Sequence, residues 1–218
     1  MAVERPARLP ELWARWAGWA RGVVCTAGVA LSWASSAQAQ APTQPQPQPP
    51  APLLAACAVC HGAGGNAQIN QFPSLAGQPR LFIENQLVLI REVLRDVPTM
   101  KDTMAGMSDD TIIGLARHFS ALALQPRPGP TDAARTELGA RIAKGMLCGT
   151  CHLPSYLGQQ QVPRLAGQNE VYLLQAMKDF RDKPGPGRDT LMSEALRGLK
   201  DDELGHLAHY LARFGVTR

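Results

Sequence analysis

Charged and aromatic residues are both scarce in this sequence of 218 residues, a length that allows one or two domains. Aspartate, glutamate, lysine and arginine make up 18% of the chain, below the ~25% of an average globular protein. Aromatic residues make up only 6%. The hydrophobic fraction of 45% is sufficient for a packed core. The number of aromatic rings, however, is small for two cores built from protein alone.

Other absences exclude whole classes of function. The formal net charge of +4 falls to +2 when the four arginines and two glutamates of residues 1–39 are set aside, and no later segment clusters lysine or arginine. The sequence therefore lacks the basic footprint of a nucleic-acid-binding protein. It also contains no glycine-rich phosphate loop and no Ser/His/Asp arrangement, so no catalytic constellation stands out.

Residues 1–39 have the pattern of a secretory signal peptide. Four arginines precede a short apolar run at residues 22–34, and Ala37-Gln38-Ala39 matches a small-x-small cleavage site. The apolar run is shorter than the ~20 residues that span a bilayer. We expect cleavage after Ala39 and export to the periplasm. Membrane association through an uncleaved signal anchor is the alternative.

Two proline-rich stretches divide the rest of the chain. Residues 40–52 are dominated by proline and glutamine, a composition that favours an extended polyproline spacer. A second break, at residues 126–133, contains three further prolines. We therefore predict two domains, at residues 53–125 and 134–218.

The two predicted domains repeat each other. The shared features are a Cys-x-x-Cys-His motif at residues 57–61 and 148–152, a Pro-x-Leu-Ala-Gly-Gln segment at residues 73–78 and 163–168, and a methionine at residues 100 and 192. They occur in the same order and 90–92 residues apart, which indicates a duplicated domain.

Both halves are predicted to be all-α, because apolar residues recur at helical spacing and no segment shows the alternation of a half-buried strand. In the first half we predict helices at residues 79–95 and 109–123, the latter capped by Ser108. In the second half we predict one helix capped by Thr131 or Asp132 and two more that begin near Asn169 and near Asp201. The expected buried positions are Leu138, Ile142 and Met146 in the first of these and Leu204, Leu207, Ala208 and Leu211 in the last.

The Cys-x-x-Cys-His motif is the signature of covalent haem attachment in c-type cytochromes. Two cysteines three positions apart lie on one face of a helical turn, where their thiols can form thioethers with the two vinyl groups of one porphyrin. The following histidine then lies under the iron as its proximal ligand. We therefore predict two haem c groups, whose apolar rings also complete two small cores. The predicted attachment residues are Cys57, Cys60, Cys148 and Cys151, and the predicted proximal ligands are His61 and His152.

Three alternatives share part of this pattern. Zinc ribbons also use Cys-x-x-Cys pairs, but about 15–20 residues separate the pairs, whereas 87 residues separate Cys60 from Cys148. A thioredoxin-like motif requires a βαβ context, which the helical pattern does not provide. Plain disulfides suit an exported protein but leave the two histidines unexplained.

A methionine is the expected sixth ligand of each iron, since His/Met coordination raises the haem potential and suits electron carriers. In the second half Met192 lies 40 residues after His152, in expected loop sequence before the last helix. In the first half Met100 occupies the same frame, and Met104 and Met107 compete with it.

Weaker signals surround these sites. A backbone carbonyl at Pro73 or Pro163 is placed to accept the Nδ1 proton of the proximal histidine and so fix its ring. The repeated Leu-Ala-Gly-Gln segment is expected to pack and cap. Arg80 and Arg164 are candidates to pair with haem propionates. The other histidines, His118, His206 and His209, are expected to be surface or partly buried helix residues.

The chain resembles diheme class I cytochromes c of the cytochrome c4 family over about residues 53–215. The resemblance rests on both Cys-x-x-Cys-His motifs, on both Pro-x-Leu-Ala-Gly-Gln segments and on Met100 ahead of Met107-Ser108-Asp109-Asp110. It implies two tandem class I cytochrome c domains, each a few short helices wrapped around one covalently bound haem. The axial ligands that it implies are His61, Met100, His152 and Met192. The sequence departs from the family where Leu153 and Pro154, not glycine, follow the second motif.

The resemblance also implies a function. Such cytochromes carry electrons in the bacterial periplasm between redox proteins, such as an upstream membrane donor and a haem–copper terminal oxidase. Two six-coordinate irons leave no open position, so we expect no enzymatic activity. The alternatives are the cytochrome subunit of a dehydrogenase complex, which the Pro/Gln spacer favours, and a diheme peroxidase-type enzyme, which would need one vacant iron position.

Overall fold

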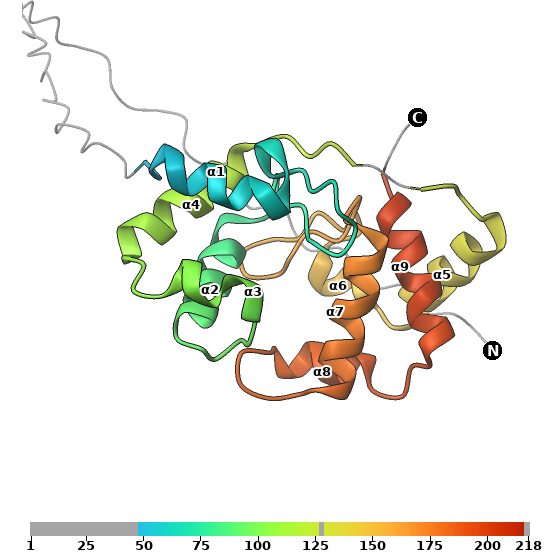
Figure 1. Cartoon of the computed structure of the whole chain (residues 1–218). Helices are drawn as coiled ribbons and strands as arrows, with labels where there is room; N and C mark the ends of the chain where they lie inside the picture. Colours follow the sequence, from blue (N-terminus) through green and yellow to red (C-terminus); the bar gives the residue numbers. More distant parts are fainter. Residues whose placement is uncertain (1–47, 127–128, 216–218) are drawn as a thin grey trace, which may run out of the picture. The chain divides into compact units, whose positions relative to one another are not determined.

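The computed structural model describes residues 48–126 and 129–215, so the predicted signal peptide and most of the predicted spacer lie outside the described residues. Within these two ranges the chain is helical and contains no strand, which confirms the predicted all-α class (Figure 1). The helices of the first half are α1 (Ala51–His61), the 3-10 turn η1 (Ala63–Gly65), α2 (Arg80–Arg91), α3 (Pro98–Met104) and α4 (Asp109–Ala121). Those of the second half are α5 (Ala133–Gly145), α6 (Cys148–His152), α7 (Glu170–Asp182), α8 (Thr190–Leu196) and α9 (Asp201–Arg213).

Polar caps begin two helices where the sequence predicts them. The hydroxyl of Ser108 accepts a hydrogen bond from the amide of Thr111 over 3.3 Å at the start of α4. The carboxylate of Asp132 accepts one from the amide of Arg135 over 3.0 Å at the start of α5. Such caps satisfy amide groups that have no partner inside the first turn of a helix.

Two helical predictions differ from the structure. The helix expected at residues 79–95 is α2, which ends at Arg91, and Val93 has a φ of 57°. A left-handed residue of this kind cannot continue a right-handed helix. Met192 lies in the short helix α8, not in a loop, because Asp189 caps that helix by accepting a hydrogen bond from the amide of Met192 over 2.9 Å.

In the first half, α2 and α4 pack together and support the remaining helices. One apolar cluster contains Ile83, Leu115, Ala116 and Phe119, and a second contains Ile90, Met104 and Ile112. Leu53 and Leu54 of α1 pack against the first cluster, and Met104 at the end of α3 belongs to the second. Both α1 and α3 are therefore held in place by the α2–α4 pair.

In the second half, α9 supplies more of the core than any other helix and crosses α5 at very short range. The predicted buried stripe of α9 is confirmed, since Leu204, Leu207, Ala208 and Leu211 are at most 2% exposed. A Cβ atom on Gly139 would lie only 2.2 Å from the carbonyl oxygen of His206 in α9. Only a glycine at this position allows so close an approach of the two backbones.

The stripe predicted for α5 is wrong in one position. Gly139 and Ala143 are buried and face α9, while Leu138 and Ile142 are half-buried. Met146 is 39% exposed, because α5 ends at Gly145 and the chain leaves the helix there.

The two halves meet through the repeated Pro-x-Leu-Ala-Gly-Gln segments. Gln168 exchanges two hydrogen bonds with the backbone of Ser74, and Gln78 exchanges two with the backbone of Arg164. All four residues are at most 5% exposed. Asn169 adds a further bond from its side-chain amide to a carbonyl of the first half, at 2.7 Å. The repeat that the sequence leads us to expect as packing and capping sequence therefore also joins the halves.

Among the residues that the structure describes, no helix combines the length and apolar character needed to cross a membrane.

Candidate functional site

The first Cys-x-x-Cys-His motif forms the last turns of α1. Cys57 and Cys60 carry free thiols, and both are half-buried. His61 is the final residue of the helix and is 7% exposed. Burial raises the pKa of the Cys57 thiol, as does the neighbouring Cys60. Two thiols and an imidazole thus lie within one turn of one helix, the arrangement that haem attachment requires.

The imidazole of His61 is fixed by the backbone. Its Nδ1 lies 2.9 Å from the carbonyl oxygen of Pro73. Because a carbonyl oxygen can only accept a hydrogen bond, the proton is on Nδ1 and the lone pair is on Nε2. Burial lowers the pKa of His61, and the Pro73 carbonyl opposes this only in part. The ring is therefore neutral, and its free nitrogen is available to a metal.

The second motif has the same geometry, although its helix is interrupted. The chain leaves α5 and passes through Leu147, which has a left-handed φ of 56°, before it forms the short helix α6. His152 at the end of α6 is 7% exposed, and its Nδ1 lies 2.9 Å from the carbonyl oxygen of Pro163. Burial again lowers the pKa of the histidine. The predicted hydrogen bond between each histidine and a proline carbonyl is therefore confirmed.

The residue after each motif adopts the same unusual backbone conformation. Gly62 has φ 76° and ψ 162°, and Leu153 has φ 66° and ψ 155°. A Cβ atom on Gly62 would lie 2.0 Å from the carbonyl oxygen of Asn66. This region of backbone space is nearly restricted to glycine and costs about 1–3 kcal/mol for other residues. The second half therefore stores strain beside its histidine where the first half does not.

The structure separates the candidate methionines by burial. Met104 is 1% exposed and belongs to the apolar cluster of Ile90 and Ile112. Met100, one turn earlier in α3, is only half-buried, as is its counterpart Met192 in α8. Met107 follows α3 and packs against the first-half clusters.

The two arginines named as propionate partners differ sharply. Arg80 forms an exposed ion pair with Glu84 at 2.8 Å. Arg164 is 2% exposed and donates to the carbonyl oxygens of Ser74, Ala76 and Ala166. Its Nε has no partner among the described residues. Burial lowers the pKa of Arg164 to about 10, so the group is still charged at neutral pH. A buried cation with only carbonyl partners suits a nearby carboxylate such as a propionate.

His209 is buried, contrary to the expectation of a surface or partly buried histidine. It is 2% exposed, and its Nε2 accepts a hydrogen bond from the amide of Asp132 over 3.0 Å. Its Nδ1 faces Glu170 at 3.2 Å. Both ring nitrogens are therefore engaged within the second half, so this histidine is not available to an iron.

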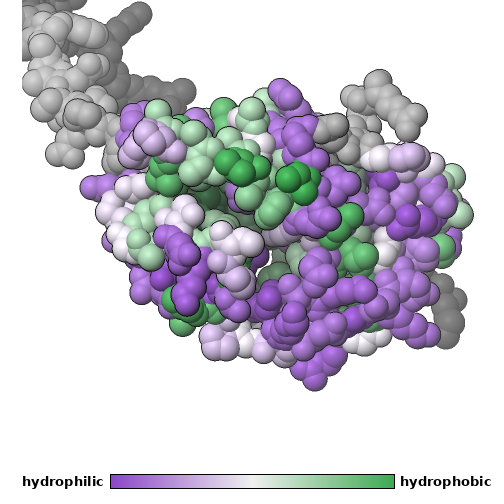
Figure 2. Space-filling view, in the orientation of Figure 1, coloured by the Kyte–Doolittle hydropathy of each residue, from purple (hydrophilic) through white to green (hydrophobic). Residues whose placement is uncertain are grey.

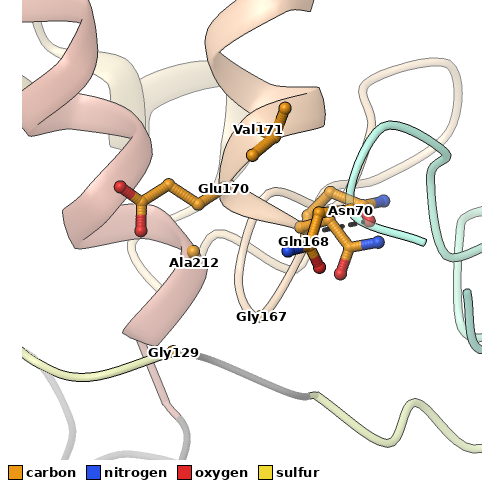
Figure 3. Close-up of a pocket in the computed structure, with 8 residues that line it drawn as sticks. Asn70, Gly129, Gly167, Gln168, Glu170, Val171 and Ala212 are labelled. Carbon is orange, nitrogen blue, oxygen red and sulfur yellow. Dashed lines mark hydrogen bonds between the residues drawn. The ribbon is translucent and has the colours of Figure 1, made fainter. Parts of the chain in front are cut away.

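A small pocket lies at the start of α7, where the halves meet (Figure 3). Gln168 lies beside Asn70 of the first half on one side of it, and Glu170 points to the other side, toward α9. The Glu170 carboxylate there accepts hydrogen bonds from Arg213 and Arg135. The carboxylate of Glu170 is thus occupied by contacts that join helices.

Hydrophobic side chains gather on the surface over α1, while the surface over α7 and α8 is mostly hydrophilic (Figure 2). Val59, between the two cysteines of the first motif, is 77% exposed. The first motif therefore lies at an apolar part of the surface.

Sequence reasoning found the cysteines and histidines, but it missed what Gln78 and Gln168 do. Their only signal was the repetition of the Leu-Ala-Gly-Gln segment in both halves. Nothing local in the sequence shows that each glutamine bonds to the opposite half.

Comparison with known proteins places this geometry in a family. The family model for cytochrome c matches residues 136–214. Cytochrome c4 of Pseudomonas aeruginosa is 30% identical over 166 residues, which are 72% of this chain and 83% of that protein. The thiosulfate dehydrogenase electron acceptor of Thiomonas intermedia is 32% identical over 202 residues, 87% of this chain and 88% of that protein.

The fold agrees with the sequence comparison. The crystal structure of reduced recombinant cytochrome c4 from Pseudomonas stutzeri superposes with a TM-score of 0.68 at 27% identity. The superposition covers 74% of this chain and 94% of that chain. The free thiols and neutral, oriented histidines of both motifs fit haem c, and the cofactor is covalently bound haem c with its iron. The chain belongs to the cytochrome c4 family of diheme c-type cytochromes, which are electron-transfer proteins and not enzymes.

Proposed function

We propose that the two motifs hold one haem each. Cys57 and Cys60 attach the first haem and His61 ligates its iron. Cys148 and Cys151 attach the second haem and His152 ligates its iron. Met100 and Met192 would supply the second protein ligand of each iron. The observation that carries this assignment is the matched pair of buried histidines, each with Nδ1 bound to a proline carbonyl over 2.9 Å.

The repeat supports a ligand role for Met100 and a core role for Met104. Met100 and Met192 occupy equivalent positions in α3 and α8, and both are half-buried. Met104 is equivalent to Leu196, and the two are 1% and 3% exposed in the apolar clusters of their halves. A methionine that stands where the other half has leucine is a core residue. Met100 is therefore the better ligand.

A bound haem c supplies an iron that cycles between the ferric and ferrous states. The chain's own contribution is to hold each imidazole neutral, to fix its orientation through Pro73 or Pro163, and to exclude water from it. With histidine and methionine on each iron no ligand position stays open, which suits electron transfer and not catalysis.

The proposal also covers the localisation, the domains and the partners of the protein. Residues 1–39 direct export to the periplasm, and residues 53–125 and 134–218 form the two haem domains. The separate apolar clusters of the two halves support that division. The partners of a protein in this family are redox proteins, and we propose a membrane donor upstream and a haem–copper terminal oxidase downstream.

A second candidate role is electron acceptor for a dehydrogenase. The observation that favours it is the similarity to the thiosulfate dehydrogenase electron acceptor of Thiomonas intermedia, which covers 87% of this chain. The two roles can be separated by kinetics with purified partners. Fast reduction by a thiosulfate dehydrogenase identifies the acceptor role, and fast oxidation by a terminal oxidase identifies the respiratory one.

The test of the haem assignment is a haem count and a carbon monoxide titration. The protein is produced with haem maturation, haem c is quantified per chain, and the reduced form is exposed to carbon monoxide. We expect two haems and no spectral response. The double variant C148A/C151A serves as the control and should retain one haem. A wild-type haem that binds carbon monoxide would contradict the axial assignment, and a chain without haem would contradict the whole proposal.

A further inference from the structure

Each proximal histidine is linked through a single peptide unit to a glutamine of the opposite half. In the first half, Nδ1 of His61 donates to the carbonyl oxygen of Pro73 over 2.9 Å. The amide of Ser74 belongs to the same peptide unit, and it donates to Oε1 of Gln168 over 2.8 Å. Donor, peptide and acceptor thus form one continuous chain of hydrogen bonds that crosses between the halves.

The second half contains an equivalent chain of hydrogen bonds, in which the two halves exchange roles. Nδ1 of His152 donates to the carbonyl oxygen of Pro163 over 2.9 Å. The amide of Arg164, in the same peptide unit, donates to Oε1 of Gln78 over 2.9 Å. The glutamine of the first half therefore serves the histidine of the second, and the glutamine of the second serves the histidine of the first.

Glutamine fits this place because its side-chain amide can bond to both backbone groups of one residue. Its oxygen accepts from the backbone N–H, and its nitrogen donates to the backbone carbonyl oxygen. Nε2 of Gln168 donates to the carbonyl oxygen of Ser74 over 2.9 Å, and Nε2 of Gln78 donates to that of Arg164 over 3.0 Å. The two bonds fix the side-chain amide and hold its oxygen against the peptide N–H. A leucine of similar size could fill the space but could make neither bond.

Burial increases the electronic effect of these chains. The two glutamines, Ser74 and Arg164 are at most 5% exposed, and both histidines are 7% exposed. In a site of low dielectric, hydrogen bonds in series polarise and strengthen one another. A peptide whose N–H is bound to a glutamine oxygen has a more negative carbonyl oxygen. That carbonyl is a stronger acceptor for the histidine Nδ1 proton, and the imidazole becomes a more basic ligand.

We propose that Gln168 and Gln78 are crossed positioning residues, each of which sets the redox potential of the haem in the other half through the peptide that binds its proximal histidine. The proposal rests on the haem assignment above. A more basic imidazole stabilises the ferric iron, so each intact chain lowers the potential of the haem that it reaches. The halves thereby share more than a contact surface, because each completes the ligand environment of the other.

The test uses the holoprotein with two near-isosteric apolar variants. Gln168→Met is expected to raise the midpoint potential of the haem at Cys57 and Cys60 and to change the other haem less. Gln78→Met is expected to show the reverse pattern. The two potentials are resolved by a redox titration followed by NMR, in which signals of the first haem are identified through contacts with Phe72, whose ring centre lies 6.2 Å from that of His61.

A second readout reports the hydrogen bond itself. In the reduced, diamagnetic protein the Nδ1 proton of the histidine moves upfield when its acceptor weakens. Gln168→Met should move the His61 signal and leave the His152 signal in place. Gln168→Glu keeps an oxygen for the Ser74 amide and makes it more negative, so it should lower the potential of the first haem where methionine raises it.

Asn169→Leu is the matched control. The side chain of Asn169 also crosses between the halves, through a 2.7 Å bond to the carbonyl oxygen of Phe72. Its backbone amide donates to Oε1 of Gln168 over 2.9 Å, and the substitution keeps that amide. The control should leave both potentials nearly unchanged.

Three results would overturn the proposal. Each glutamine variant could mainly shift the potential of the haem in its own half. Gln168→Met and Gln168→Glu could shift the potential of the first haem in the same direction, or the control could shift the potentials as much as the glutamine variants do. Any of these results from a protein with two haems would leave the haem assignment intact, whereas loss of haem from the wild type would overturn both.

Discussion

Arg213 donates a hydrogen bond of 2.6 Å to the carboxylate of Glu170 and so ties the last turn of α9 to the first turn of α7. Arg135 of α5 reaches the same carboxylate over 2.9 Å, and the ring of His209 faces it at 3.2 Å. One carboxylate thus connects the three long helices of the second half. Those helices position the second haem motif, since α5 leads directly into α6.

Glu170→Gln is expected to destabilise the second half in a pH-dependent way. Burial alone would raise the pKa of Glu170, but the hydrogen bond and charge of Arg213, with the charge of Arg135, lower it overall. A carboxylate whose pKa is lower in the folded state contributes stability above its unfolded pKa and loses that contribution as the pH falls through the folded pKa. We expect a loss of about 1–2 kcal/mol at pH 7, which disappears in acid.

Denaturant unfolding followed by far-ultraviolet circular dichroism at several pH values measures this effect. The matched control is Glu194→Gln, which removes an exposed ion pair with Arg197 and should change little. A difference between Glu170→Gln and the wild type that stayed constant from pH 7 to pH 3 would contradict the charge-based explanation.

Leu153→Gly is expected to stabilise the protein. Leu153 holds a backbone conformation that glycine adopts without strain, and it is only half-buried and lies outside the apolar cluster of the second half. Relief of the strain should raise the free energy of unfolding by about 1 kcal/mol after the entropy cost of glycine is subtracted. Thermal unfolding of the holoprotein measures the change.

The reverse substitution in the first half provides the control. Gly62→Ala places a Cβ atom 2.0 Å from the carbonyl oxygen of Asn66 and should destabilise. If Leu153→Gly lowered the melting temperature as Gly62→Ala does, the strain assigned to the turn after His152 would be refuted.

Met100 and Met104 are expected to give opposite phenotypes. Met100→Ala should remove an axial ligand, so that one haem per chain binds carbon monoxide in the reduced protein. Met104 is 1% exposed, so Met104→Ala should leave both haems unreactive and lower the free energy of unfolding by about 2–5 kcal/mol through the cavity that it creates. Carbon monoxide binding by the Met104 variant alone would transfer the ligand role to that residue.

The features that could be predicted from the sequence are local or periodic. The helical spacing of α9 gave its buried face, and the capping residues Ser108 and Asp132 gave the starts of two helices. The cysteine motifs gave the cofactor, because their chemistry is contained in five consecutive residues. The repeat then predicted that Pro73 and Pro163 have the same role in both halves, which the two hydrogen bonds confirm.

The features that could not be predicted depend on contacts between distant segments. Gln168 and Ser74 are 94 residues apart, and neither has a neighbour in sequence that signals their pairing. The positive φ of Leu153 is not visible in a residue that normally avoids it. The exposure of Met146 follows from where α5 ends and from how it crosses α9 at Gly139, which a helical pattern alone does not specify.

Gly139→Ala is expected to separate α5 from α9 and to weaken the support of the second haem motif. The added Cβ atom would lie 2.2 Å from the carbonyl oxygen of His206 and 2.6 Å from the Cβ atom of Tyr210. Because a backbone carbonyl cannot turn aside as a flexible side chain can, the helices must move apart, at a cost of about 1–3 kcal/mol. Gly205→Ala is the matched control, since Gly205 lies in α9 and a Cβ atom there meets nothing within 4 Å. That control should stabilise by about 0.5–1 kcal/mol through helix propensity. Thermal unfolding of both variants decides the point, because helix propensity alone would make Gly139→Ala stabilising as well.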